Sequence, residues 1–241
     1  QVTDTPTGNN FIQASGGKDH SVALHADGYL VSWGWDDYGQ ITDTPISNDF
    51  IQVSVGDYHS VALRANGSLV SWGDSWFNHG QVTDTPPGND FTQVAGGEFH
   101  SVALRADGSL VAWGNDGYSQ ISDTPLGNNF TQISAGGGHS VALRADGSLV
   151  SWGQDVYFQV RGTPPGNNFT DVSAGSRHSV AVRADGSSVS WGWDYYSQVS
   201  DALRRNDFTQ VSAGGYHSVA IVYGDDGPLV ADAMDNDGAI G

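Results

Sequence analysis

The stretch His139-Ser-Val-Ala-Leu-Arg-Ala-Asp-Gly147-Ser-Leu-Val-Ser-Trp-Gly153 decides the fold of this 241-residue chain. Two short apolar runs flank Asp146-Gly147, and an Asp-Gly pair in that position is typical of a tight β-hairpin because glycine tolerates positive φ. Close copies of the stretch recur along the chain, and their histidines are spaced 39, 41, 39, 39 and 39 residues apart. Such a period predicts an architecture of one repeated supersecondary unit. The six histidines are His20, His59, His100, His139, His178 and His217.

Each copy contains four short segments with strand character. In the fourth copy, residues 130–135, 140–144 and 148–152 are apolar or alternating, and residues 120–124 are more polar. Four-stranded units at a period near forty residues are typical of propeller blades. We therefore expect an all-β fold, a single closed six-bladed β-propeller of four-stranded antiparallel blades. The N-terminal strand, residues 1–6, is expected to complete the last blade and so leave no open sheet edge.

The repeats also predict the domain organisation. The whole chain, residues 1–241, is expected to form one β-propeller domain. In the last copy Asp232 and Ala233 replace the Trp-Gly pair, so that blade is expected to pack less well, as terminal repeats often do. The predicted repeats are 1–39, 40–80, 81–119, 120–158, 159–197 and 198–241.

The composition excludes several kinds of partner and site. The formal net charge is −18, from nine Lys and Arg against 27 Asp and Glu, so nucleic acid and anionic membrane surfaces are poor partners. Many of the aspartates lie in Asp-Gly and Thr-Asp-Thr-Pro segments, where they serve turn chemistry. Cysteine is absent, which excludes disulfides and thiolate metal sites. Abundant Asp with a single Lys suits an extracellular or secreted protein, and we expect a bacterial source.

Two motifs resemble the signatures of a known family. Val211-Ser-Ala-Gly-Gly-Tyr-His217-Ser-Val-Ala and Trp33-Gly-Trp-Asp-Asp-Tyr-Gly39-Gln are similar to the two marks of the regulator of chromosome condensation repeat family. The resemblance implies a propeller of four-stranded blades. In repeat length the chain is closest to the bacterial β-lactamase inhibitory propeller of the same repeat class, which binds its enzyme through aromatic loop residues on one face. Nothing resembles the wedge with which the family's founder acts on a small GTPase, so nucleotide exchange is not expected.

The six copies separate positions that the fold dictates from positions that vary. Two places vary, the pair of residues before each histidine and the stretch after each Trp-Gly. In an antiparallel meander both places lie at the same end of the sheet, so we expect one aromatic and acidic face. Aromatic residues in exposed loops provide the contact area that binding hot spots use. The predicted partner-binding residues are Trp35, Tyr58, Trp76, Phe77, Phe99, Trp193, Tyr195 and Tyr216. The recurring Tyr38, Tyr118 and Tyr157 fit packing between blades equally well.

No catalytic, metal or cofactor site is predicted. A histidine present in every blade is more often a framework group, and one ligand per blade around a ring rarely converges on one ion. No serine lies in a recognisable nucleophile arrangement. The sequence therefore favours a non-enzymatic, monomeric protein-binding propeller, either an enzyme inhibitor or an adhesion or scaffold module. The alternatives are a carbohydrate-binding propeller that takes a glycan, and an amplified or designed propeller with no evolved partner.

Overall fold

The computed structural model describes residues 4–73, 79–200, 205–224 and 227–231. Within these residues the chain forms eighteen β-strands and no helix. The strands are β1 (Phe11–Gly16), β2 (His20–His25), β3 (Leu30–Gly34), β4 (Phe50–Val55), β5 (His59–Arg64), β6 (Leu69–Gly73), β7 (Phe91–Gly96), β8 (His100–Arg105), β9 (Leu110–Gly114), β10 (Phe130–Ala135), β11 (His139–Arg144), β12 (Leu149–Gly153), β13 (Phe169–Ala174), β14 (His178–Arg183), β15 (Ser188–Gly192), β16 (Phe208–Ala213), β17 (Ser218–Gly224) and β18 (Gly227–Ala231).

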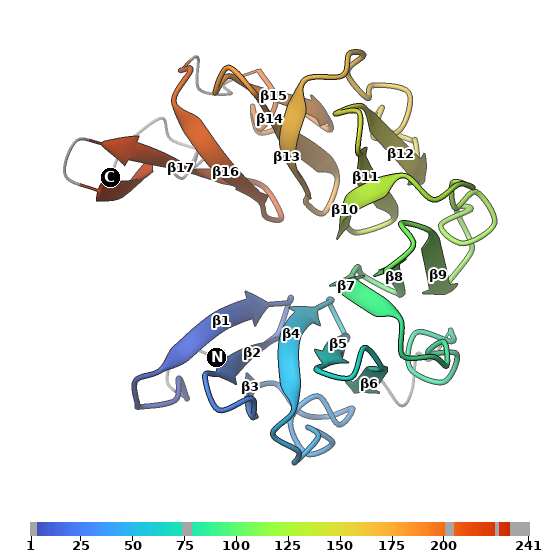
Figure 1. Ribbon diagram of the computed structural model, residues 1–241, viewed down its shortest axis with the longest axis vertical. Coiled ribbons are helices and arrows are strands. Elements are labelled where there is room, and N and C mark those ends of the chain that lie inside the picture. The colour runs from blue at the N-terminus through green and yellow to red at the C-terminus, as the bar shows by residue number, and fades with distance from the viewer. Residues whose placement is uncertain (1–3, 74–78, 201–204, 225–226, 232–241) are drawn as a thin grey trace.

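Each consecutive trio of strands forms an antiparallel three-stranded sheet in chain order, and we number these sheets blades 1 to 6. Figure 1 shows the blades arranged around a centre, with β1, β4, β7, β10, β13 and β16 innermost. In blade 4, β11 and β12 pair from His139 opposite Gly153 to Leu143 opposite Leu149, around the Asp-Gly hairpin. A bulge between Phe130 and Gln132 interrupts the pairing of β10 with β11, and the other inner strands carry the same bulge.

The predicted fourth strand is wrong: each blade has three strands, and the polar segment folds into turns. In blade 3 the Asp116 carboxylate accepts hydrogen bonds from the amides of Ile121 and Ser122 at 2.8 and 3.0 Å. The side-chain oxygen of Gln120 accepts one from the Tyr118 amide at 2.7 Å. These side chains bind backbone amides that a strand would need for its ladder, so the segment forms a capped turn.

The predicted closed ring is also wrong. No sheet joins the first blade to the last among the described residues, and Figure 1 shows the six blades as an open arc with blades 1 and 6 beside the opening. The expectation that the N-terminal strand completes the last blade is wrong for the residues that the structure describes, because residues 4–8 form no strand, while residues 1–3 lie outside the described residues. Among the described strands, each blade consists of consecutive strands of the chain, and none pairs blade 1 with blade 6.

The core lies between neighbouring blades. The second strand of each blade is the middle strand of its sheet, and residues 139–143 are all buried. Val141, Leu143 and Leu149 of blade 4 pack against Phe169 and the rest of the blade 5 cluster. This explains why the second strand is a continuous apolar run, because both of its faces are covered.

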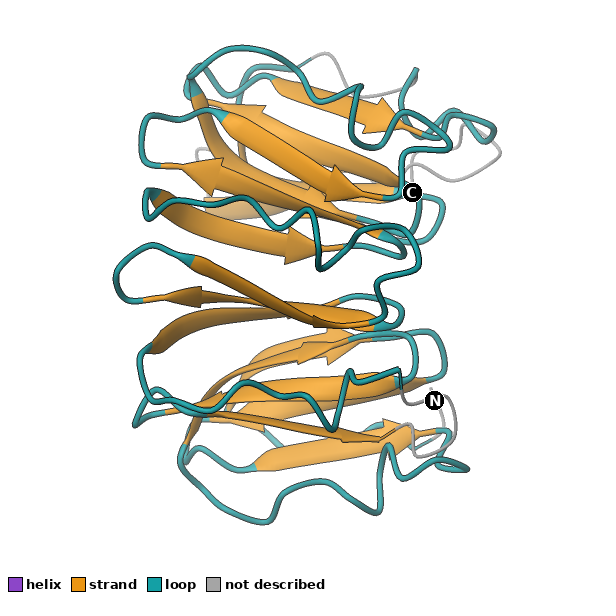
Figure 2. Ribbon diagram, turned by 90° about the vertical axis from the view of Figure 1, so that its right-hand side faces the viewer, coloured by secondary structure: helices purple, strands orange, loops and turns teal. Residues whose placement is uncertain are grey.

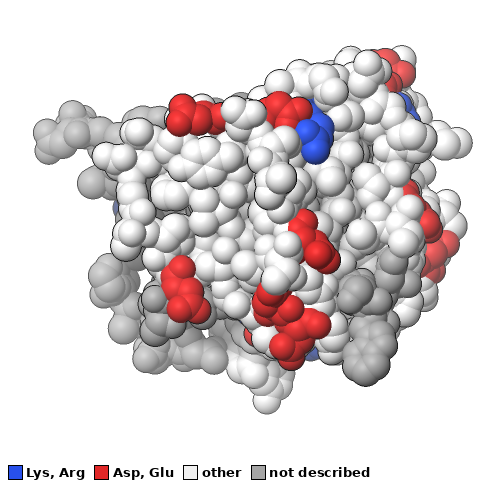
Figure 3. Space-filling model, turned by 90° about the horizontal axis from the view of Figure 1, so that it is seen from below, with Lys and Arg blue, Asp and Glu red and all other residues white. Residues whose placement is uncertain are grey.

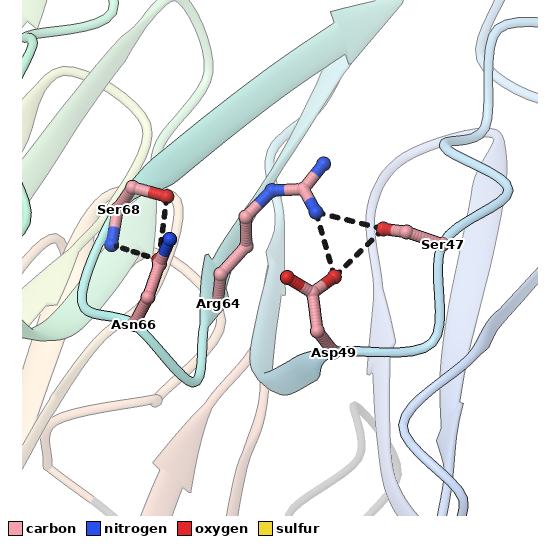
Figure 4. A network of polar contacts seen from close by, with 5 residues as sticks. All are labelled: Ser47, Asp49, Arg64, Asn66 and Ser68. Atoms are coloured by element: carbon pink, nitrogen blue, oxygen red, sulfur yellow. Dashed lines mark hydrogen bonds and ion pairs between the residues drawn. The ribbon is translucent and has the colours of Figure 1, made fainter.

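In blades 2 and 3, an arginine at the end of the second strand holds the connection that enters the blade. Figure 4 shows Arg64, whose Nη1 donates to Asp49 Oδ1 at 2.6 Å and to Ser47 Oγ at 2.8 Å. The hydrogen bond from Arg64 holds the pKa of Asp49 below its usual range. In the adjacent hairpin, Asn66 Oδ1 accepts hydrogen bonds from the amide and hydroxyl of Ser68 at 2.9 and 2.7 Å. Much of the acidity is therefore turn chemistry, as the sequence indicated.

The repeated histidines join neighbouring blades. The Nε2 of His59 is hydrogen-bonded to Ser101 Oγ at 2.7 Å, and the Nε2 of His100 to Ser140 Oγ at 2.8 Å. All five histidines that make this bond are buried. The framework role expected from the sequence is confirmed, although the partner is a serine hydroxyl of the next blade rather than backbone. The full set of pairs is His20–Ser60, His59–Ser101, His100–Ser140, His139–Ser179 and His178–Ser218.

Glycines bring the backbones of neighbouring blades close together beside these histidines. A Cβ at Gly56 would overlap the carbonyl oxygen of Gly97 and lie 2.8 Å from the His59 ring. A Cβ at Gly97 would meet the carbonyl of Gly136 and the His100 ring in the same way. Only glycine fits this position, because any side chain would push the blades apart.

Glutamine side chains add a second set of bonds across four of the five junctions, and the Asp171 carboxylate takes their place at the junction of blades 5 and 6. Gln52 Oε1 accepts from the Val94 amide at 3.1 Å, while its Nε2 donates to the Val94 carbonyl at 3.2 Å. Ser54 Oγ accepts from the Gly96 amide at 3.0 Å. These side chains bind the neighbouring inner strand as another strand would, so the blades associate by polar recognition as well as by apolar packing.

We predict that Ser140→Ala destabilises the protein by about 1–3 kcal/mol, because it leaves the buried His100 ring without its partner. The measurement is urea unfolding followed by tryptophan fluorescence. Ser122→Ala is the matched control, since Ser122 is exposed and bonds only to the turn aspartate. Equal midpoints for the two variants would contradict the junction role of Ser140.

Acid should weaken the junctions. Burial lowers the pKa of His59 to about 3 and that of His100 to about 4, from the usual histidine value of about 6.5. The unfolded state therefore binds more protons, so the contribution of each histidine to stability is complete above about pH 6.5 and falls as the pH drops. Each such histidine lowers the free energy of unfolding by about 1.4 kcal/mol per pH unit between about pH 6 and pH 4.

The check is the slope of stability against pH, measured for the parent and for His59→Gln. We expect the free energy of unfolding to change less steeply with pH in the variant, by the amount that corresponds to about one fewer proton taken up on unfolding. Protonation of the many carboxylates at low pH reduces the net negative charge of both proteins equally, so its effect on stability cancels when the two slopes are compared. An unchanged slope in His59→Gln would contradict the prediction.

Candidate interaction surface

The two variable places of the repeat lie together in blades 1, 3, 4 and 5, as predicted. The amide of Trp35 donates to the Asp19 carbonyl at 2.8 Å, and the amide of Trp193 donates to the Arg177 carbonyl at 2.9 Å. Equivalent bonds join these places in blades 3 and 4. Figure 2 shows that the strands run between two loop-bearing ends of the molecule. We call the end that carries residues 17–19, 35–39 and their equivalents the variable face.

Aromatic residues of three blades meet on the variable face. The rings of Trp193 and Tyr195 are stacked, with centroids 5.8 Å apart and planes 10° apart. Tyr216 of blade 6 lies 5.8 Å from Trp193 and 5.2 Å from Tyr196, and Tyr157 of blade 4 lies 5.8 Å from Trp193. We call these five residues the aromatic cluster. Tyr195 and Tyr216 are 76% and 57% exposed, so the cluster offers ring surface to solvent.

A cation already contacts this cluster. The Arg177 guanidinium lies 5.1 Å from the Trp193 ring centre and 5.6 Å from that of Tyr157. Arg177 itself is exposed. Trp193 thus packs against several rings and one guanidinium, and this environment fixes its orientation before any partner arrives.

A second, smaller group lies on blades 1 to 3. The rings of Tyr58 and Phe99 are stacked, with centroids 5.0 Å apart, and His79 meets Phe99 edge-on at 5.6 Å. Lys18 Nζ donates to the Tyr58 hydroxyl at 3.0 Å, and this hydrogen bond raises the pKa of Lys18. Both aromatic residues are half-buried, so this group presents less ring surface than the aromatic cluster.

The other predicted binding residues have different surroundings. Trp35 is half-buried and packs edge-on against Tyr38, with centroids 4.8 Å apart. Trp76 and Phe77 lie outside the described residues. The expectation that recurring tyrosines pack between blades does not suit Tyr118, which is 55% exposed. The structure thus brings Trp193, Tyr195 and Tyr216 together, and separately Tyr58 and Phe99.

Two carboxyl groups on the variable face are partly desolvated. Burial raises the pKa of Asp57. Burial also raises the pKa of Glu98, and the negative charge of the nearby Asp57 contributes a smaller part of that rise. Figure 3, a view of one side of the molecule, shows acidic side chains in several separate groups with few basic ones. The acidity of that side is therefore dispersed rather than gathered in one field.

The centre of the arc holds a hollow of about 720 Å³, which blades 2 to 5 line with threonine and glutamine and with four leucine and isoleucine side chains. The Thr92 hydroxyl donates to the Leu104 carbonyl at 3.2 Å, and the side-chain Nε2 of Gln93 donates to the Ile133 carbonyl at 3.4 Å. These polar groups hold the blades and are not aimed at a ligand. No group of three or more His, Cys, Asp or Glu gathers within metal-binding reach in the described part of the chain. Nor do those residues include a helix of the length and hydrophobicity that a bilayer crossing needs.

Sequence reasoning missed several members of these groups. Arg177, Lys18 and Glu98 all belong to the variable pairs before the histidines, which was the available signal. Tyr157 recurs at its position in several repeats, so packing between blades explains it as well as partner binding does. Its contact with Trp193 depends on how neighbouring blades are turned, which a single repeat does not specify.

Solved structures share the fold. The ectodomain of the receptor kinase CR4 from Physcomitrella patens is 25% identical with a TM-score of 0.71, and the alignment covers 89% of this chain and 59% of that one. The CRINKLY WD40 ectodomain of the receptor kinase ACR4 from Arabidopsis thaliana is 22% identical with a TM-score of 0.73, over 95% and 83% of the two chains. Prp20p from Saccharomyces cerevisiae is 22% identical with a TM-score of 0.70, over 88% and 69%. The chain spans less than two thirds of the CR4 ectodomain.

The search of curated proteins found no match. The predicted closeness to the β-lactamase inhibitory propeller therefore stays a prediction. The pattern of the regulator of chromosome condensation (RCC1) repeat matches residues 11–40, 50–81, 91–120, 130–159 and 169–198, which is more than half of the chain. Each matched segment contains the three strands of one blade and ends at the glutamine of the turn that follows the blade. The chain belongs to the RCC1 repeat family.

Proposed function

We propose that this chain is a non-catalytic module that binds a protein partner through its variable face, with the aromatic cluster at the centre of the contact. The observation that carries the proposal is the packing of the exposed Tyr195 and Tyr216 against the half-buried Trp193. Rings held in place before binding lose little conformational freedom on contact, which is what hot-spot residues require. The second group, around Tyr58 and Phe99, would serve as a flanking contact on blades 2 and 3.

Relatives of this fold support a protein partner. The yeast protein Prp20p is described with binding properties toward Gsp1p and histones, and yeast RCC1 (Prp20) has been solved bound to Kap60. At 22% identity these likenesses show the fold alone, so the partner of this chain follows from its own surface. The net charge of −18 and the cluster of rings fit a partner with a neutral or basic surface.

The finer expectations remain proposals. Inhibition of an enzyme, adhesion and scaffolding would each use the same surface. We also propose that residues 1–241 act as one domain, because each blade packs on the next, and that the protein works as a monomer outside the cell. Two of the similar structures are receptor ectodomains, which agrees with that location.

The test is capture of a partner on the immobilised chain, identification by mass spectrometry, and calorimetric titration with the purified partner. A variant with Trp193→Ala, Tyr195→Ala and Tyr216→Ala should bind at least about thirtyfold more weakly, which corresponds to about 2 kcal/mol or more. Tyr195 and Tyr216 are exposed, and Trp193 is half-buried outside the core cluster of its blade, so the variant should remain folded, which thermal unfolding checks.

The matched control replaces Ile46 and Leu126 with alanine. These side chains are 102% and 97% exposed, in the proline turns rather than the loops of the variable face. We expect unchanged binding in the control. Equal affinity of the aromatic variant and the parent would contradict the proposal, and glycan binding that the same variant loses would favour a carbohydrate-binding propeller instead.

A further inference from the structure

The hairpin of blade 2 carries the only Asn-Gly pair of the chain, Asn66-Gly67. Asn66 is exposed, and its Oδ1 accepts hydrogen bonds from the amide and hydroxyl of Ser68 at 2.9 and 2.7 Å. In blade 3, Asp107 Oδ1 accepts the same two bonds from Ser109 at 2.9 and 2.7 Å. The hairpin therefore accepts either residue, and asparagine in blade 2 changes the reactivity of the side chain. The equivalent residues of the other described hairpins are Asp27, Asp107, Asp146 and Asp185.

An asparagine followed by glycine can modify itself. The backbone nitrogen of Gly67 attacks Cγ of Asn66, a nitrogen–carbon bond forms, and the carboxamide nitrogen leaves as ammonia after it takes up the proton that the Gly67 amide loses to solvent. Water then opens the five-membered succinimide. Attack of water at Cγ gives aspartate, whereas attack at the main-chain carbonyl carbon gives isoaspartate, in which the backbone runs through the side chain. Glycine favours the first step because it has no side chain to block the approach.

The aspartates of the other hairpins react less readily. Hydrogen bonds from Ser109 hold the pKa of Asp107 below its usual range, and those from Ser148 do the same for Asp146. These carboxyl groups are therefore ionised at neutral pH, and an ionised carboxylate has no good leaving group. The Asn66 carboxamide carries no charge and keeps its leaving group, so blade 2 is the blade in which this chemistry is available.

The folded hairpin engages both reacting groups. The Gly67 amide, which is the attacking nitrogen, donates its proton to the Arg64 carbonyl at 2.9 Å. The Asn66 carboxamide is bound to Ser68, as Figure 4 shows. Formation of the succinimide needs the loss of the first bond and a turn of the carboxamide away from the second. The reaction should therefore proceed from an opened hairpin.

We propose that Asn66 is a site of spontaneous modification through a succinimide, which the folded hairpin of blade 2 holds back and an opened hairpin releases. The two products differ in their consequences. Aspartate is the residue of the other hairpins, so blade 2 keeps its fold. Isoaspartate lengthens the backbone immediately before Gly67, whose carbonyl accepts from the Phe91 amide at 3.1 Å and whose Cα lies so close to Asn89 that a Cβ would overlap the Asn89 carbonyl. Isoaspartate therefore disturbs the contact between blades 2 and 3.

The experiment incubates the full chain at mildly alkaline pH, in buffer and in urea, and follows Asn66 by peptide mass spectrometry. An isoaspartyl methyltransferase serves as the probe for isoaspartate. We expect conversion at Asn66 to be at least about tenfold faster in urea than in buffer, because opening of the hairpin limits the native rate. Asn129 and Asn168 are the matched controls within the chain, since both are exposed and each precedes a phenylalanine. Both should convert more slowly than Asn66 in urea.

Ser68→Ala tests the restraint itself. The variant lacks one of the two bonds that hold the carboxamide, so conversion in buffer should rise about threefold to tenfold while the rate in urea stays the same. Ser148→Ala changes the same position of the blade 4 hairpin and should leave the rate at Asn66 unchanged.

Stability separates the two products. Asn66→Asp, which has the sequence of the first product, should keep the urea midpoint of the parent. The isoaspartate form, separated by chromatography, should unfold at a midpoint lower by about 0.5 M.

Three results would overturn the proposal. The first is equal conversion at Asn66 in buffer and in urea. The second is a rate in urea no faster than that at Asn129. The third is an isoaspartate form with the midpoint of the parent. None of these readouts depends on a partner at the variable face, so failure here leaves the proposed function intact.

Discussion

The structure depends on how one blade recognises the next. Each junction combines apolar packing with a buried histidine–serine hydrogen bond and a glycine at the closest approach of two backbones. Buried polar groups are costly unless they are paired, so a junction with a misplaced blade would lose both its bonds and its packing. The histidine, the serine and the glycine must therefore all be present in each repeat.

Much of this framework could be predicted from the sequence. The period, the Asp-Gly hairpins and the apolar second strand identified the three strands of each blade, since strand and hairpin signals are local. The fourth strand could not be separated from a turn in the same way. Residues 120–124 form a short polar segment like an edge strand, but the Asp116 carboxylate binds the Ile121 and Ser122 amides that pairing would need. Closure failed as a prediction because it depends on the angle between blades, which no single repeat encodes.

The sequence predicts the face on which the candidate site lies, but it predicts only some of the residues that meet there. Comparison of the six copies located the variable face, and the bonds from Trp35 to Asp19 and from Trp193 to Arg177 show why its two parts stay together. The meeting of Tyr157, Trp193 and Tyr216 could not be predicted, because it involves three blades whose relative orientation is a tertiary property. Arg177 joins them for the same reason. The aromatic cluster thus arises from contacts between repeats, while the repeat itself mainly specifies the scaffold.

The position of the junction glycines has a consequence for how such a protein changes over time. Gly56, Gly97 and Gly136 fix the path of the backbone immediately before the variable pairs, and the buried histidines fix it immediately after them. Substitutions between these two anchors change the surface while the anchors hold the blade in place, except at Gly137, where a Cβ would overlap the Ser176 carbonyl. A pair that proves useful in one blade can therefore be copied into another by recombination between repeats. The variable pairs are therefore positions at which sequence can be exchanged between repeats, so a new surface can arise by recombination without a change of fold.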